Sequence, residues 1–284
     1  MANLYRDPRS TITTHHDTYL YISPSKFTGS LHGKVILLTG AGRGIGRASA
    51  LAFAAAGANV ACISRTHSDT LSLVQEISQK GHPRAIAISA DVMDADAPAR
   101  VVEEVQGELG SIDVLINNAG ISRISDVEHE NGMGPAMEVV EVVSVLATIS
   151  LPYFSAYSAA KAALIRSTHI MDLELRRHDI YSYAVHPCMS RDTTLGKGAL
   201  NLEAHEKVEG IKKFMEEFVP SMTDTVQLPA DTFVALVADP DAKYMSGKYI
   251  DSTQDLGMVL EEAKKGPESR IEREGLYVLK ADTL

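Results

Sequence analysis

The feature that most constrains the fold of this 284-residue chain is a glycine-rich turn near residue 40. The apolar run VILLT (35–39) leads directly into TGAGRGIG (39–46), and an alanine-rich segment follows. Bare backbone at Gly40, Gly44 and Gly46 permits a tight turn from a strand into a helix. The free N–H groups and the dipole at a helix N-terminus favour a phosphate there. The turn therefore predicts a dinucleotide site, and the alternative is a βα turn without a ligand.

Short apolar runs alternate with longer amphipathic segments from residue 34 onward. This alternation is typical of a parallel sheet covered by helices on both faces. The expected strands are 35–39, 59–63, 85–89, 113–116, 138–143 and 180–185. The expected helices lie near 45–56, 68–80, 94–109, 153–176, 203–219 and 230–238. The sequence thus predicts an α/β fold, a Rossmann-type doubly wound parallel sheet.

The ends of the chain differ from this pattern. Residues 1–33 are rich in Ser, Thr and His, and we expect them to form an irregular N-terminal arm. Residues 34–256 are expected to form a single domain. Residues 257–284 are charge-dense and then apolar, which predicts a solvated tail that ends in a short strand packed on the body or on another subunit.

Composition excludes several classes of protein. The chain has 27 Lys and Arg against 37 Asp and Glu, and this net charge of −10 argues against nucleic-acid or membrane-surface partners. We find no membrane span and no secretory signal, so a cytoplasmic protein is expected. Two cysteines cannot build a disulfide framework, which favours a reducing compartment. No metal site is predicted, because the His and Cys spacings match no metal motif.

The end of the second expected strand indicates which nicotinamide cofactor the turn would bind. An acidic residue there would hold the ribose 2′-hydroxyl of NAD, but ISRT (63–66) has no carboxylate. Ser64 and Arg65 stand there instead, and the Arg65 guanidinium offers a bidentate partner for a 2′-phosphate. Arg43 in the glycine turn adds a second positive group. NADP is therefore the expected cofactor, NAD is the alternative, and each arginine could instead be an ordinary surface residue.

The segment YSAAK places Tyr157 and Lys161 four residues apart in a run of good helix formers. That spacing puts both side chains on one helix face. A phenol has an ordinary pKa of about 10 and is a poor acid–base catalyst at neutral pH. A neighbouring ammonium favours the phenolate and is expected to lower the pKa of Tyr157. The pair predicts acid–base catalysis, and its alternative is a pair on a helix surface.

Together these motifs resemble the short-chain dehydrogenase/reductase family over about residues 34–256. The resemblance also rests on Asp91-Val92, on NNAG (117–120) and on Ser144, which lies 13 residues before Tyr157. It implies that Tyr157 is the general acid/base and that Ser144 hydrogen-bonds the substrate oxygen. Lys161 would tune Tyr157 and bind the nicotinamide ribose. The implied reaction is hydride transfer between NADP and a carbonyl or alcohol group of a small molecule.

The resemblance implies further cofactor contacts. Asp91 would contact the adenine, and Asn117 would help to hold the cofactor and the central strand. Thr193 is the nearest candidate for the nicotinamide carboxamide contact, although it is offset by one residue. The expected cofactor-binding residues are Gly40, Arg43, Gly44, Ile45, Gly46, Ser64, Arg65, Asp91, Val92, Asn117, Tyr157, Lys161, Pro187 and Thr193.

The resemblance also implies a homo-oligomer, and the arm and tail are similar to those of reductases of filamentous fungi, often found in secondary metabolism.

Two departures from the family pattern keep a second function open. The connection between the fourth and fifth strands (117–138) has 22 residues and is shorter than in relatives, where it carries a helix and a proton-relaying asparagine. Gly132, Gly134 and Pro135 leave little room for that helix, and no residue can be assigned the asparagine role. After the sixth strand, Cys188 stands where relatives have glycine. The alternative is a redox-silent protein on the same fold, either a pseudoenzyme or a non-redox catalyst.

Overall fold

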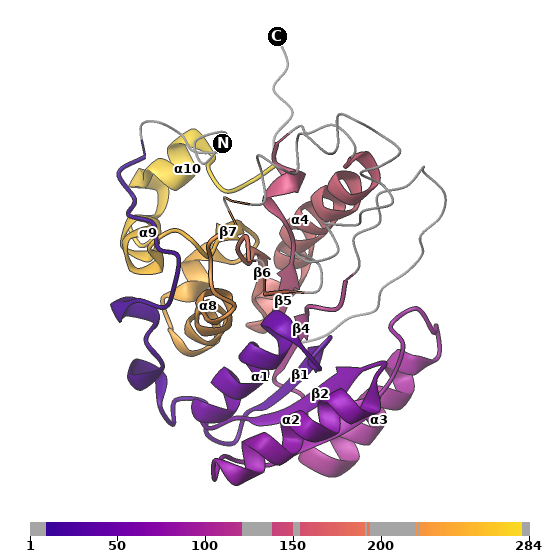
Figure 1. Cartoon of the computed structure of the whole chain (residues 1–284). Helices are drawn as coiled ribbons and strands as arrows, with labels where there is room; N and C mark the ends of the chain where they lie inside the picture. Colours follow the sequence, from indigo (N-terminus) through magenta and orange to yellow (C-terminus); the bar gives the residue numbers. More distant parts are fainter. Residues whose placement is uncertain are drawn as a thin grey trace.

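The computed structural model describes residues 10–120, 138–149, 154–190, 192–193, 220 and 222–279. Its centre is a seven-stranded sheet in the order β3-β2-β1-β4-β5-β6-β7, in which every neighbouring pair is parallel (Figure 1). The strands are β1 Val35–Thr39, β2 Asn59–Ser64, β3 Ala85–Ser89, β4 Val114–Asn117, β5 Glu138–Val142, β6 Ser182–His186 and β7 Tyr249–Asp251. The predicted doubly wound fold is confirmed. The strand order reverses between β1 and β4, where open α/β sheets bind ligands.

Helices cover both faces of this sheet. The α-helices are α1 Gly44–Ala55, α2 His67–Gln79, α3 Ala97–Leu109, α4 Ser155–Leu175, α8 Gln227–Ala238, α9 Leu256–Ala263 and α10 Arg270–Glu274. The helix expected at 203–219 lies outside the described residues. Within the described ranges, no helix is both long and apolar enough to cross a membrane.

Alternate strand residues pack against opposite layers of helices, as the pleat of a strand requires. On one face, Ile36 and Leu38 share a core cluster with Phe53 of α1, Leu73 of α2 and Phe233 of α8. On the other face, clusters join the neighbouring strand residues to α3 and α4; their members include Leu37, Ile63, Val101, Val105, Val143, Ile165 and Ala184. Burial on both faces explains why these strands read as continuous apolar runs.

The N-terminal arm is part of the core. It forms two 3-10 helices, η1 (Leu20–Ile22) and η2 (Pro24–Phe27), where the sequence predicts irregular structure. Ile22, Phe27 and Leu31 are buried in the same cluster as α1 and α8. Short 3-10 turns carry little periodic signal, which explains why the sequence analysis missed them. The predicted domain boundaries at residues 34 and 256 stay predictions.

The predicted solvated segment and terminal strand are wrong for the described residues, but the predicted packing of the end of the tail on the body is confirmed. Leu256–Ala263 forms α9, and its apolar residues at 256, 259, 260 and 263 are buried. This is the i, i+3, i+4, i+7 spacing of an amphipathic helix, which the charged residues of the other face obscured. Residues 275–279 form no strand, although the Tyr249 N–H donates to the Tyr277 carbonyl at 2.8 Å. The tail thus contacts the outer edge of β7, a strand that the sequence analysis did not predict.

Two residues of η1 test whether the arm stabilises the domain. Ile22 is 0% exposed and Leu20 is 90% exposed. Ile22→Ala should lower the free energy of unfolding by about 2–5 kcal/mol, because it leaves a cavity in the core. Leu20→Ala should change it by less than about 0.5 kcal/mol. Urea unfolding measures both values, and equal effects of the two substitutions would contradict an arm that belongs to the core.

Candidate active site

The glycine turn brings β1 and the N-terminus of α1 into close contact. Gly40 and Gly44 have positive φ angles of 69° and 54°, which favour glycine. At Gly46, a Cβ atom would lie 2.2 Å from the Gly40 carbonyl oxygen, so no larger residue fits without a shift. The side chain of the N-cap residue Arg43 makes no capping hydrogen bond to α1, and Ile45 is half-buried. A helix N-terminus of this kind favours a phosphate, and the predicted nucleotide site at this turn stays a prediction.

A clamp between β1 and β4, which the sequence analysis missed, holds this turn. The Thr39 hydroxyl oxygen accepts hydrogen bonds from the N–H groups of Asn118 (3.1 Å) and Ala119 (3.0 Å). The Asn118 side-chain amide donates to the Thr39 carbonyl at 2.9 Å. The motif NNAG contained the signal, but the analysis assigned a role only to its first asparagine. The clamp fixes the switch point of the sheet.

The residues expected around the adenine end come together at the carboxyl ends of β2 and β3. The Arg65 guanidinium lies 4.0 Å from the Asp91 carboxylate, and both side chains are exposed. Ser64 donates from its hydroxyl to the Thr66 carbonyl at 2.9 Å. Val92 is exposed beside Asp91. The structure therefore gathers these expected contacts at one end of the glycine turn.

An acidic residue that the sequence analysis missed also lies at this end. A Cβ atom on Gly42 would lie 2.9 Å from Cβ of Asp69 and 3.5 Å from its carboxylate oxygen Oδ2. Asp69 belongs to the first turn of α2, beyond the strand end that the analysis considered. Its negative charge opposes a 2′-phosphate, whereas exposed Arg43 and Arg65 favour one. Charges of both signs thus lie at this end: Arg43 and Arg65 against Asp69 and Asp91.

The three expected catalytic side chains lie close together between β5 and α4. Ser144 follows β5 and caps the 3-10 helix η3 (Val145–Ala147), where its hydroxyl oxygen accepts from the Leu146 N–H at 3.2 Å. Ser144 also hydrogen-bonds Tyr157, which lies in the first turn of α4. Lys161 donates from Nζ to the Val142 carbonyl at 2.7 Å. A serine, a tyrosine and a lysine from two elements thus form one polar cluster.

The electrostatics of Tyr157 differ from the expectation. Burial raises the pKa of Tyr157, and the hydrogen bond with Ser144 lowers it in part. The Lys161 ammonium lies 5.9 Å from the centroid of the tyrosine ring and is directed to the Val142 carbonyl. In this arrangement, desolvation outweighs the expected effect of the ammonium. The phenol therefore keeps its proton at neutral pH.

Two further contacts support the loop that carries Ser144. Asn117 donates from its side-chain amide to the Glu141 carboxylate at 2.7 Å and so joins β4 to β5. The Val145 N–H donates to Nδ1 of buried His186 at 3.2 Å. Burial lowers the pKa of His186, which keeps the imidazole neutral and suited to accept this bond. Both Glu141 and His186 lay outside the expected site.

The segment after β6 lies between the catalytic cluster and the glycine turn. Thr193 is 3.7 Å from the position that a Cβ atom on Gly44 would take, so it lies at the phosphate end of the site. Pro187 follows β6 directly. Burial raises the pKa of the Cys188 thiol well above its usual range, so this cysteine is not an activated nucleophile.

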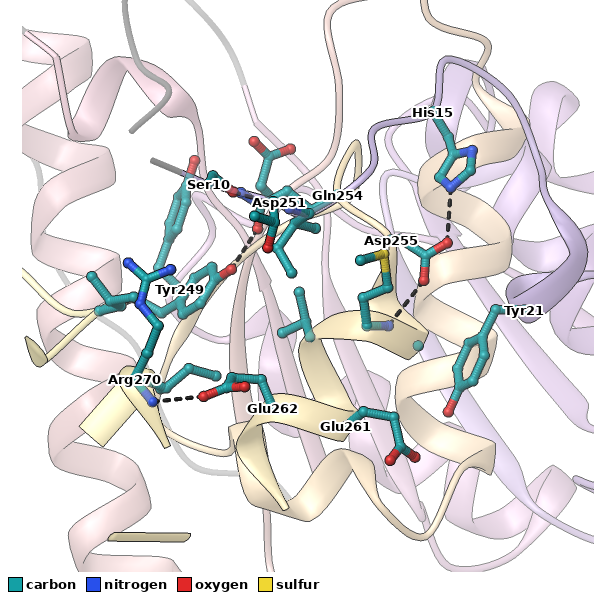
Figure 2. Close-up of a pocket in the computed structure, with 18 of the residues that line it drawn as sticks. Ser10, His15, Tyr21, Tyr249, Asp251, Gln254, Asp255, Glu261, Glu262 and Arg270 are labelled. Carbon is teal, nitrogen blue, oxygen red and sulfur yellow. Dashed lines mark hydrogen bonds and ion pairs between the residues drawn. The ribbon is translucent and has the colours of Figure 1, made fainter. Parts of the chain in front are cut away.

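A separate cavity of about 910 Å³ lies between the arm, the turn from β7 to α9, and the tail (Figure 2). Val145 and Thr148, which follow Ser144, form part of its wall, but Ser144, Tyr157 and Lys161 do not. Figure 2 shows His15 paired with Asp255 in the wall of this cavity. The two atoms, Nε2 and Oδ2, are 2.9 Å apart. The backbone N–H of Arg270 donates to the Glu262 carboxylate at 2.7 Å. The cavity is thus a neighbour of the catalytic cluster and not its cleft.

Comparison with known proteins assigns the family. The profile of the family described as short chain dehydrogenase matches residues 34–133 and 133–201. The chain belongs to the short-chain dehydrogenase/reductase family of oxidoreductases, as the resemblance implies. The two matched segments meet at residue 133, inside the connection that the sequence analysis found to be short.

Relatives and solved structures agree with this assignment. A short chain dehydrogenase of Pseudocercospora fijiensis is 35% identical over 95% of this chain and 96% of its own length. The short chain dehydrogenase pigC of Monascus ruber is 28% identical over 87% of this chain and 86% of its own. A dehydrogenase/reductase of Sinorhizobium meliloti superposes with a TM-score of 0.64 at 28% identity, covering 81% of this chain and 99% of its own. The first two confirm the expected fungal resemblance.

The glycine turn can be tested with two helical glycines. Gly46→Ala should lower the free energy of unfolding by about 1–3 kcal/mol through overpacking, and it should weaken NADPH binding because the turn must open. Gly107→Ala in α3 is the control, because its Cβ would meet nothing within 4 Å. This control should stabilise the protein by about 0.5–1 kcal/mol. Urea unfolding and calorimetric titration measure the effects, and wild-type NADPH affinity in Gly46→Ala would argue against a nucleotide at this turn.

Proposed function

We propose that the protein is an NADP(H)-dependent oxidoreductase that transfers a hydride between the nicotinamide and a carbonyl or alcohol group of a small organic substrate. The observation that carries this proposal is the half-buried Tyr157, hydrogen-bonded by Ser144 at the carboxyl edge of the sheet. The uncapped N-terminus of α1 at the same edge supports a dinucleotide beside it. Family membership supports the reaction class.

The residues of this chain suit the reduction of a carbonyl. Hydride transfer is the chemistry that the bound cofactor supplies. Burial raises the pKa of Tyr157, so the phenol carries the proton that a developing alkoxide needs. Ser144 orients the phenol and the substrate oxygen through its hydroxyl group. The Lys161 ammonium adds positive charge where the oxyanion forms.

The charges at the adenine end support NADP over NAD. Arg43 and Arg65 are both exposed and available to a 2′-phosphate. Two carboxylates lie at the same end: Asp69 beside Gly42 and Asp91, which is 4.0 Å from Arg65. The proposal of NADP therefore rests on the two guanidinium groups, whose planar forks can bind a 2′-phosphate. Asp91 and Val92 remain the proposed adenine contacts, and Thr193 and Pro187 remain proposed contacts of the segment after β6.

One observation supports the alternative, a redox-silent protein on the same fold. The family match breaks at residue 133, within the connection between β4 and β5. The Gly-rich residues of that connection, 121–137, lie outside the described part of the chain. Binding of NADPH without turnover on any carbonyl would favour this alternative.

Three broader proposals accompany the reductase. A reducing compartment such as the cytoplasm is supported by Cys62 and Cys188, which are both free thiols. A homo-oligomer is supported by Ile170 and Leu173, which are exposed apolar residues on α4. A role in fungal secondary metabolism is supported by the similarity to fungal short chain dehydrogenases.

Substitution of Tyr157 tests the reaction. Tyr157→Phe should reduce NADPH-dependent turnover of a ketone panel by at least about 10²-fold, because the proton donor is lost. Its Kd for NADPH should not change. The chain has no tryptophan, so NADPH emission reports binding directly. Tyr244→Phe, at an exposed tyrosine far along the chain, is the control and should keep wild-type turnover. Wild-type activity in Tyr157→Phe would remove the proposed mechanism.

Substitution of Arg65 tests the cofactor preference. Arg65→Gln should raise the Kd for NADPH about 10- to 100-fold, the worth of a charge-assisted hydrogen bond. The Kd for NADH should stay the same, because NADH has no 2′-phosphate. Arg84→Gln is the matched control, since Arg84 is similarly exposed but pairs with Glu108. Equal losses for NADPH and NADH would show that Arg65 does not read the 2′-phosphate.

A further inference from the structure

The proposed function leaves one buried carboxylate without a role. Glu141 lies on β5 near the centre of the sheet and is only 2% exposed. Burial disfavours its charged form and raises its pKa above the usual value for a glutamate. Such a residue destabilises the fold unless nearby groups compensate its charge. The groups that do so lie at the catalytic cluster.

Glu141 faces the helix that carries Tyr157 and Lys161. Successive side chains of a strand point to opposite faces of the sheet. Val140 and Val142 lie in the core cluster shared with α1 and α8. Glu141 therefore lies on the other face together with Val143, which packs against Ile165 of α4.

Two polar side chains from neighbouring elements converge on this point of β5. The Asn117 side-chain amide donates to Oε1 of Glu141 at 2.7 Å, and the two residues are paired in register. The Lys161 ammonium donates to the carbonyl of the next residue, Val142, at 2.7 Å. The charge of Lys161 in turn lowers the pKa of Glu141. The carboxylate and the ammonium are thus electrostatically coupled.

Burial, Asn117 and Lys161 are the causes of the shift in the pKa of Glu141. Glu138, on the same strand, lies on the opposite face, where Lys34 and Asp113 influence its pKa. Tyr157 is the titratable neighbour of Lys161 on its own helix, with the ring centroid 5.9 Å from Nζ. Asn117 from β4 and Lys161 from α4 are the groups that shift Glu141.

We propose that Glu141 is a positioning residue for Lys161: its carboxylate, oriented by Asn117, holds the ammonium at the Val142 carbonyl and keeps it protonated. The proposal rests on the proposed function, in which that ammonium supports the chemistry of Tyr157. In this arrangement, a residue of the sheet positions the lysine of α4. Loss of the carboxylate charge should therefore change the pKa of Lys161 in a variant that still folds.

The decisive variant is Glu141→Gln, which keeps an oxygen acceptor for Asn117 and removes the charge. The pKa of Lys161 should fall by about 1 unit, because a nearby negative charge no longer stabilises the ammonium. NMR titration of lysines labelled at Cε measures this value, and Lys161→Met assigns the signal. Glu138→Gln is the matched control on the same strand and should leave the Lys161 titration unchanged.

An unchanged Lys161 pKa in Glu141→Gln overturns the proposal, as does an equal fall in Glu138→Gln. If Glu141→Gln does not fold, the coupling is measured through the pKa of Glu141 in a Lys161 variant, because electrostatic coupling between two groups is reciprocal. In Lys161→Met, the pKa of Glu141 should then rise by a similar amount, followed through glutamates labelled at Cδ. An unchanged Glu141 pKa there also overturns the proposal.

The titrations need no substrate, so they separate this proposal from the reductase. If none of the ketones supports oxidation of NADPH by the wild-type protein, the proposed reductase activity is refuted. The coupling between Glu141 and Lys161 can still be measured in that case. If the wild-type protein turns over a ketone, the basic limb of its pH–rate profile should shift to lower pH in Glu141→Gln and not in Glu138→Gln. An unshifted limb contradicts a role of Glu141 in the reaction.

Discussion

The close contact between Gly46 and the Gly40 carbonyl is the constraint on which the rest of the site depends. A Cβ atom at residue 46 would lie 2.2 Å from that oxygen and 2.6 Å from the Asn118 amide nitrogen, so α1 can approach β1 only through a glycine. The same approach brings the first turn of α1 to the carboxyl ends of β1 and β4. Thr39 and Asn118 then lock the two strand ends together. The result is a helix N-terminus at the switch point of the sheet, a geometry that favours an anion.

Burial governs the chemistry of the neighbouring catalytic cluster. It raises the pKa of Tyr157 and of Glu141 and lowers that of His186, so each neutral form is favoured by desolvation. The hydrogen bonds with Ser144 and with Asn117 oppose the effect of burial on the pKa of Tyr157 and of Glu141. The neutral His186 imidazole accepts a hydrogen bond from the Val145 N–H. In such a low-dielectric region, the Lys161 charge acts on its neighbours more strongly than it would in water.

The two ends of the chain complete the body of the domain. The arm contributes Ile22 and Phe27 to the main core, and α9 contributes Leu256 and Leu260. The Tyr277 carbonyl accepts from the β7 edge, which limits the unpaired backbone that an edge strand exposes. These segments also enclose the cavity of about 910 Å³ beside the loop that carries Ser144. The chain termini therefore contribute to stability and to the surroundings of the site.

Sequence alone determined the class of fold, the position of the glycine turn and the pairing of Tyr157 with Lys161 on one helix face, whereas the place of Ser144 beside them was implied by the family resemblance. These features are written in local patterns: a strand period, a helix period, and glycines at fixed spacing. Only the tertiary structure revealed β7, the burial of the arm, the helix α9, the Asn118 clamp, Asp69 beside the turn and the role open to Glu141. The sequence analysis expected a lowered pKa for Tyr157, whereas the folded protein raises it. The reason is physical: desolvation and cross-strand contacts come from residues far apart in the chain, and no local pattern encodes which of them will meet.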